Sequence, residues 1–114
     1  DFFLYWEDIF LMNKINKTKY KMYIAHHVKA KHEVSKSSEN ALKTDYLRIS
    51  NFIYGELLYD YKLSKLRYIK VLRKLFQNFL LFFLYLGSLQ FKKTFICTSK
   101  LIGILKFLNF RIFN

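Results

Sequence analysis

The sequence predicts a small α+β domain, with an N-terminal helix-strand-helix-hairpin lobe and a short second α/β lobe. Two segments, residues 3–17 and 38–55, repeat apolar residues at helical spacing. Residues 57–75 alternate apolar and polar side chains, as half-buried strands do. The wholly apolar run 79–86 has the length of a buried strand. The expected lobes are residues 1–75 and 76–114.

The first expected element is a helix over residues 3–17. Glu7 and Asp8 occupy its early turns, where the helix dipole favours acids, and Lys14 and Lys17 come late. Its apolar stripe consists of Phe2, Trp6, Ile9, Met12 and Ile15 or Asn16. A single stripe of this kind indicates a helix that packs one face against a core.

A basic segment, residues 17–32, follows this helix. The alternation around Met22 and Ile24 predicts a short strand or an extended arm. His26 and His27 are adjacent and would point to opposite faces of a strand, which is poor geometry for holding a metal. We therefore expect no metal site and no cofactor.

The second expected helix begins after Ser37 or Ser38, either of which can cap its N-terminus. Its stripe is Leu42, Tyr46, Ile49 and Ile53. Gly55 is well placed to end it. The hairpin that follows has strands at 57–63 and 66–75 and a turn at 64–65. The second lobe is expected to contain strands at 79–86, 91–97 and 110–113 and a helix at 99–109.

Residue usage indicates an organellar origin. Lysine outnumbers arginine 16 to 4, proline is absent and there are three glycines. Lys, Asn, Phe and Ile have A/T-rich codons, so we infer that a strongly AT-biased genome, such as a mitochondrial one, encodes the chain. The shortage of Pro and Gly also removes the usual turn signals. The single cysteine, Cys97, excludes an internal disulfide.

Positive charge is the strongest functional signal. The net charge is +12, and after Asp60 the chain carries eleven Lys or Arg and no acid. Because unrelieved like charge repels itself, we expect RNA or an anionic membrane face to supply the missing negative charge. Aromatic residues that can stack on bases are interleaved with the cations, which favours RNA. The residues expected to bind RNA are Lys14, Lys17, Lys19, Lys21, Arg67, Arg73, Lys92 and Lys93.

The sequence gives less support to two other function classes. The acids are few and scattered and no glycine-rich phosphate loop is present, so we expect neither an enzyme nor a small-molecule substrate. The charge-free run 75–91 is shorter than the about 20 residues of a membrane helix, although cations flank both of its ends. The alternative function is therefore an accessory membrane subunit of an organellar respiratory or ATP synthase complex.

The order of elements resembles the small-subunit ribosomal protein eight family. The segments that carry the resemblance are 12–15 (MNKI), 49–58 (ISNFIYGELL), 66–74 (LRYIKVLRK) and 88–95 (SLQFKKTF). The family's Ser-Thr-Ser-Lys-Gly motif is missing, and residues 98–100 (TSK) echo it at a different place. The resemblance implies an α+β fold that binds ribosomal RNA.

These observations predict a structural constituent of a mitochondrial ribosome in the matrix, encoded by the organelle. Its expected partners are ribosomal RNA and neighbouring ribosomal proteins, and its expected role is to stabilise assembly of the small subunit. Lysines and arginines would contact phosphates, so recognition would follow RNA shape and backbone more than base sequence.

Overall fold

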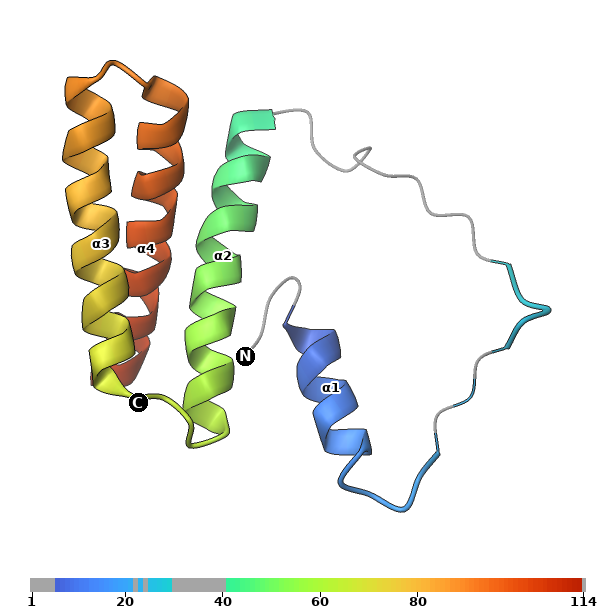
Figure 1. Ribbon diagram of the computed structural model, residues 1–114. Coiled ribbons are helices and arrows are strands. Elements are labelled where there is room, and N and C mark those ends of the chain that lie inside the picture. Colours follow the sequence, from blue (N-terminus) through green and yellow to red (C-terminus); the bar gives the residue numbers. More distant parts are fainter. Residues whose placement is uncertain (1–5, 22, 24, 30–40, 114) are drawn as a thin grey trace.

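The computed structural model describes residues 6–21, 23, 25–29 and 41–113, and every regular element in these ranges is a helix (Figure 1). The helices are α1 (Glu7–Ile15), α2 (Ala41–Lys62), α3 (Tyr68–Gly87) and α4 (Phe91–Phe113). The predicted α+β fold is therefore wrong, because the described part of the chain contains no strand and no hairpin of strands.

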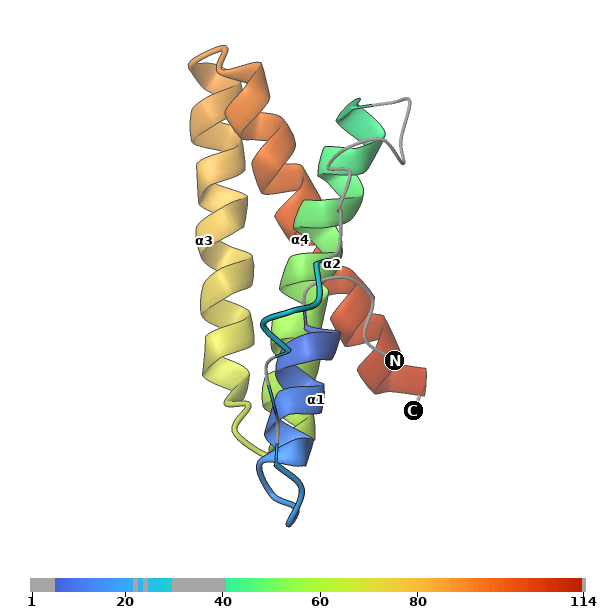
Figure 2. The same cartoon turned by 90° about the vertical axis from the view of Figure 1, so that its right-hand side faces the viewer.

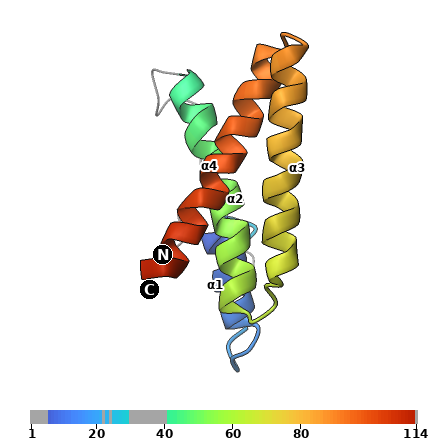
Figure 3. The same cartoon turned by 90° about the vertical axis from the view of Figure 1, so that its left-hand side faces the viewer.

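Helix α4 joins the fold together, because it packs against both α2 and α3. Helices α3 and α4 form an antiparallel hairpin, and α4 crosses α2 at an angle (Figure 3). The short α1 lies along the side of α2 that faces away from α3 (Figure 1, Figure 2). Helices α2 and α4 thus each have protein on two sides, whereas α3 contacts the rest of the chain through one side only.

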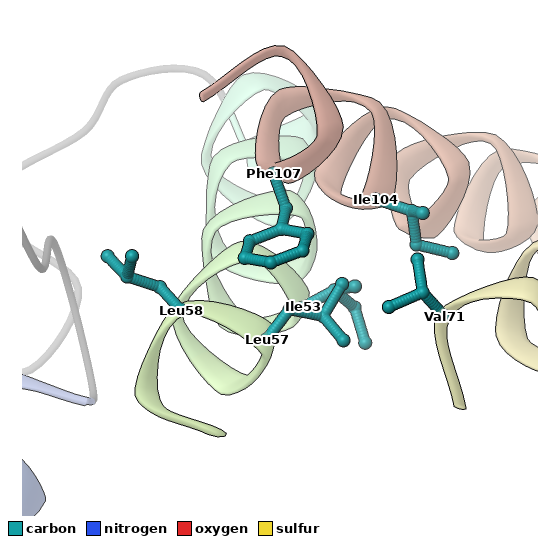
Figure 4. Packing of buried hydrophobic residues seen from close by; sticks show 6 residues of the cluster. All are labelled: Ile53, Leu57, Leu58, Val71, Ile104 and Phe107. Carbon is teal, nitrogen blue, oxygen red and sulfur yellow. The ribbon is translucent and has the colours of Figure 1, made fainter. Parts of the chain in front are cut away.

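The core is a small cluster where α2, α3 and α4 meet (Figure 4). It consists of Ile53, Leu57, Leu58, Val71, Ile104 and Phe107. On α2 the buried positions Ser50, Ile53 and Leu57 follow one another at steps of three and four, which is helical spacing. The stripe therefore continues into the region predicted to be the first strand of the hairpin, and this explains why residues 57–62 are helical.

Gly55 lies inside α2 and does not end it, contrary to the prediction. A Cβ atom at this position would lie 2.5 Å from Cδ1 of Trp6, so the glycine makes room for the indole. The Trp6 ring also packs against Phe52 and Tyr59, with ring centroids 5.5 and 5.2 Å apart. Gly55 is thus the place where Trp6, the N-cap residue of α1, docks on α2.

Helices α2 and α3 both end in a Schellman motif whose left-handed position is not occupied by glycine. Ser64 and Leu89 take the left-handed position, with φ of 56° and 57°. At the end of α2, the amide of Lys65 donates to the carbonyl of Asp60 at 2.8 Å, and the amide of Ser64 to that of Tyr61 at 3.0 Å. A non-glycine residue in this conformation costs about 1–2 kcal/mol. Sequence patterns rarely place a helix end at such residues. The prediction placed a turn at 64–65, but between strands, and identified neither Ser64 nor Leu89 as a helix end.

The remaining predicted strands are also helical. Residues 66–75 begin in the connection after α2 and continue into α3, and 79–86 lies wholly within α3. Residues 91–97 and 110–113 lie in α4, which also contains the predicted helix 99–109. Apolar residues are so dense in these segments that a period of two and a period of 3.6 can both be read from them.

Predictions for the N-terminal half fare better. The first predicted helix is confirmed over Glu7–Ile15, and the second is confirmed from Ala41 onward, although it runs on to Lys62. The predicted strand at Met22 and Ile24 and the predicted caps Ser37 and Ser38 lie outside the described residues. The proposed lobe boundary between residues 75 and 76 falls inside α3.

Candidate nucleic-acid interface

A cationic cleft lies at the corner between α2 and α3. It encloses about 290 Å³ and is lined by Lys65, Arg67, Ile69, Lys70 and Arg73. Helix α3 begins here with Arg67 in an extended conformation at its N-cap, with no side-chain cap and no acidic residue in the first turn. The positive end of the helix dipole therefore adds to the charge of the side chains. This corner is suited to bind an anion.

Two cations near this corner are neutralised inside the protein. The Lys70 amine lies 2.5 Å from a carboxylate oxygen of Asp60 and 3.0 Å from one of Glu56. The Lys74 amine lies 2.8 Å from the other Glu56 oxygen. Both acids come from α2, so they supply part of the negative charge that the sequence predicted to come from outside the chain.

The ion pairs between α2 and α3 shift the pKa values of Glu56 and Lys70. Burial alone would raise the pKa of Glu56, but hydrogen bonds and charge from Lys74 and Lys70 outweigh it, and the pKa lies below its usual 4.5. Burial would likewise lower the pKa of Lys70, yet its bonds to Asp60 and Glu56 raise it above 10.5. Glu56 thus remains ionised, and the two lysines are held against α2.

We expect acid to weaken the fold through Glu56. Because its pKa is depressed on folding, its contribution to stability is complete above pH 4.5 and is lost as the pH falls through the lower folded value. Glu56→Gln is expected to reduce the free energy of unfolding at pH 7 by about 1–2 kcal/mol and to flatten this acid dependence. Denaturant titrations at neutral and acidic pH measure both effects.

A matched control is Asp45→Asn. Asp45 pairs with Arg48 at 3.7 Å, but both side chains are more than half exposed. Water screens such a pair, so its loss should change stability by less than about 0.5 kcal/mol. Equal losses in the two variants would contradict a special role for Glu56.

The cations that remain at the corner are Lys65, Arg67 and Arg73. All three side chains are exposed, and none forms an ion pair with another described residue. Arg67 and Arg73 were predicted as RNA contacts, and the fold brings them to one cleft. Lys65 was missed, because the sequence predicted it to lie in a tight turn between strands.

The other predicted contacts lie on two separate surfaces. Lys14 is in the last turn of α1, and Lys17, Lys19 and Lys21 follow in the exposed segment after that helix, on the side of α2 away from α3 (Figure 1). Lys92 and Lys93 are exposed at the start of α4. The eight predicted residues therefore form three clusters and not one continuous site.

Some cations serve the fold. The Lys106 amine lies 3.4 Å from Ser50 Oγ and 3.3 Å from Asn51 Oδ1, between α4 and α2. The Arg111 guanidinium donates to the Tyr68 hydroxyl and lies 4.5 Å from the Tyr61 ring centroid. Lys106 and Arg111 are accounted for by internal contacts, so we do not assign these two cations to an interface.

A larger groove separates the first half of α2 from the first half of α4. It has a volume of about 1000 Å³. Its walls are mostly apolar, and Lys92 and Lys100 of α4 lie along it. It is lined by Leu42, Asp45, Arg48, Ile49, Phe52, Ile53, Glu56, Lys74, Phe91, Lys92, Phe95, Ile96 and Lys100.

Within the described ranges, no three His, Cys, Asp or Glu side chains lie close enough together to hold a metal ion. Among those same residues, no helix combines the length and hydropathy needed to cross a membrane.

In comparisons with known proteins, no family model matches the chain, and no curated protein or solved structure is significantly similar to it. The resemblance to the ribosomal family depended on a strand hairpin at residues 57–75. These residues form the end of α2, a connection and the start of α3. The family's residue roles are therefore not transferred to this chain.

Proposed function

We propose that this protein binds RNA as a small structural subunit of a ribonucleoprotein particle, with the α2–α3 corner as one of its phosphate contacts. The observation that carries the proposal is the cleft in which Lys65, Arg67 and Arg73 converge at the N-terminus of α3. The lysine and arginine side chains bind phosphates, and arginine can hold two phosphate oxygens at once.

Exposed aromatic residues next to these cations support RNA as the polyanion. Tyr68 follows Arg67 directly and is 65% exposed. Tyr20 and Tyr23, beside Lys19 and Lys21, are 82% and 85% exposed. A tyrosine that faces solvent beside a cation can stack on an unpaired base while the cation binds the adjacent phosphate.

The particle that best fits the composition is an organellar ribosome. The AT-biased residue usage and the net charge of +12 are the observations behind this choice. A small helical protein with separate cationic clusters on different sides can bridge RNA segments, which is a role in assembly and not in catalysis. The contacts would again follow backbone and shape.

Removal of the corner charges is expected to weaken RNA binding. In the variant Lys65→Gln/Arg67→Gln/Arg73→Gln, loss of two to three phosphate contacts should reduce the salt slope of log K by about two and the affinity at 0.1 M salt at least about tenfold. Filter binding of the full chain to organellar ribosomal RNA across a salt series measures both quantities.

The control Lys29→Gln/Lys43→Gln/Lys100→Gln removes the same charge from three separate places. It should retain most of the affinity if the corner is a site, and should lose as much as the corner variant if binding reflects net charge alone. A wild-type affinity that does not depend on salt would contradict RNA binding as such. Sedimentation with ribosomal particles, abolished by ribonuclease, tests the choice of particle.

A further inference from the structure

The outward face of α3 is apolar along its whole length. Nine large apolar side chains of this helix are between 42% and 67% exposed. They are Tyr68, Ile69, Leu72, Phe76, Phe79, Leu80, Phe83, Leu84 and Leu86. We refer to these nine residues as the α3 face.

Helix α3 differs from a surface helix in a soluble protein, because its outward side is apolar while its inward side combines the core residues Val71 and Leu75 with polar side chains. Its inward side carries Lys70, Lys74 and Asn78, which are partly buried and bonded to α2 or to the helix backbone. The α3 face presents on the order of 1,000 Å² of apolar surface. The largest patch on a typical monomer is about 300–600 Å². A surface of this size requires an occupant.

Charge distinguishes between the possible occupants. Arg73 is exposed within the α3 face, because it lies one turn from Ile69 and Phe76 and two turns from Leu80. The chain has no acid after Asp60, and the two acids nearest in sequence, Glu56 and Asp60, are already paired with lysines. A second copy on this face would bury Arg73 in an apolar interface without a carboxylate, which is unfavourable. Anionic phosphate groups would supply the missing charge.

We propose that the α3 face docks on the surface of an anionic phospholipid bilayer, with α3 lying in the interface. The phenylalanines Phe76, Phe79 and Phe83 would enter the boundary between headgroups and acyl chains. Arg67 and Arg73 bind lipid phosphates at the N-terminal end, and the arginine stem can lie along the apolar surface while its head reaches them. Lipid and RNA would compete for Arg67 and Arg73 at the corner, whereas α1 and its lysines lie on the other side of α2 and stay available to RNA (Figure 1).

Co-sedimentation of the RNA-free full chain with vesicles tests this docking. We expect binding to phosphatidylcholine vesicles that contain phosphatidylglycerol, and at least tenfold weaker binding without it. Leu72→Gln/Phe76→Gln/Phe83→Gln is expected to lower the affinity at least about tenfold. The control Leu11→Gln/Leu42→Gln/Ile112→Gln changes three equally exposed apolar residues on other helices and should bind like the wild type. Equal binding by all three proteins would overturn the proposal.

A second measurement locates the contact without relying on the triple variants. In a Cys97→Ala background, an environment-sensitive fluorophore is attached at Phe83→Cys or at Leu11→Cys on α1. Vesicles should enhance the signal at position 83 and leave position 11 unchanged. A response at position 11 alone would overturn the proposal in favour of attachment by the α1 lysines. A lipid-free dimer that the α3-face variant dissociates would overturn it in favour of a second copy.

Discussion

Replacing Gly103 by alanine is expected to lower the free energy of unfolding by about 2–3 kcal/mol. Gly103 lies in α4 where this helix crosses α2, and a Cβ atom there would lie 2.4 Å from the carbonyl oxygen of Ser50 and 3.0 Å from Cβ of Ile53. The nearest obstacle is backbone and cannot rotate away. Alanine would gain about 1 kcal/mol in helix propensity. The steric cost exceeds this gain, because α4 must move away from the core that it shares with α2.

Gly87→Ala is the matched control for this prediction. Gly87 is also a helical glycine, at the end of α3, but nothing lies within 4 Å of a Cβ atom built there. The same substitution should therefore leave stability unchanged or raise it by up to about 1 kcal/mol. Denaturant unfolding followed by helical circular dichroism compares the two variants. If both became more stable, the close approach of α2 and α4 would be disproved.

The sequence predicted α1 and the first half of α2 because their apolar residues repeat at one unambiguous spacing. It failed after Gly55, which was interpreted as a helix end. What decides the role of this glycine is Trp6, about fifty residues earlier in the chain, whose indole occupies the space of a side chain. A contact that depends on how α1 is placed against α2 leaves no local signal.

The alternation at residues 66–75 illustrates a second kind of error. If the same residues form a helix, Lys70 and Lys74 are four residues apart on one side of it, and Ile69, Leu72 and Phe76 lie on the other side. Only the acids of α2 show which interpretation holds, because Glu56 binds both lysines at once. The ends of α2 and α3 could not be recognised from the sequence either, because Ser64 and Leu89 take the left-handed conformation in which glycine is expected.

The candidate interface was predicted in composition but not in arrangement. Cation-rich segments were evident from charge alone, and Arg67 and Arg73 do line one cleft. The sequence could not show that Lys70 and Lys74 are neutralised internally or that Lys65 joins the cleft, because both depend on the packing of α3 beside α2. The apolar run at 79–86 was expected to be buried in a sheet. In the structure this run lies in α3, and most of its side chains belong to an exposed helix face and not to the core.

Phe107 is the largest fully buried side chain in the described structure, with 1% exposure, and it projects from α4 against α2 (Figure 4). The Tyr61 ring meets it edge-on, with centroids 6.2 Å apart. Phe107→Ala removes the ring from a core of six buried residues and leaves a cavity that two crossing helices cannot close. We expect a loss of about 3–5 kcal/mol in the free energy of unfolding.

A loss of this size is a large part of the 5–15 kcal/mol that stabilises a typical domain, so Phe107→Ala is expected to be partly unfolded at 25 °C. Phe107→Leu keeps most of the volume and should lose about 1.5 kcal/mol or less. Leu105→Ala, on the same helix but 54% exposed, controls for the change in helix composition and should stay near the wild type. Thermal and denaturant unfolding of the four proteins should rank them as wild type, Leu105→Ala, Phe107→Leu and Phe107→Ala. If Phe107→Ala and Leu105→Ala were equally stable, α4 would not pack on α2 through this ring, and the place of α4 between α2 and α3 would have to be revised.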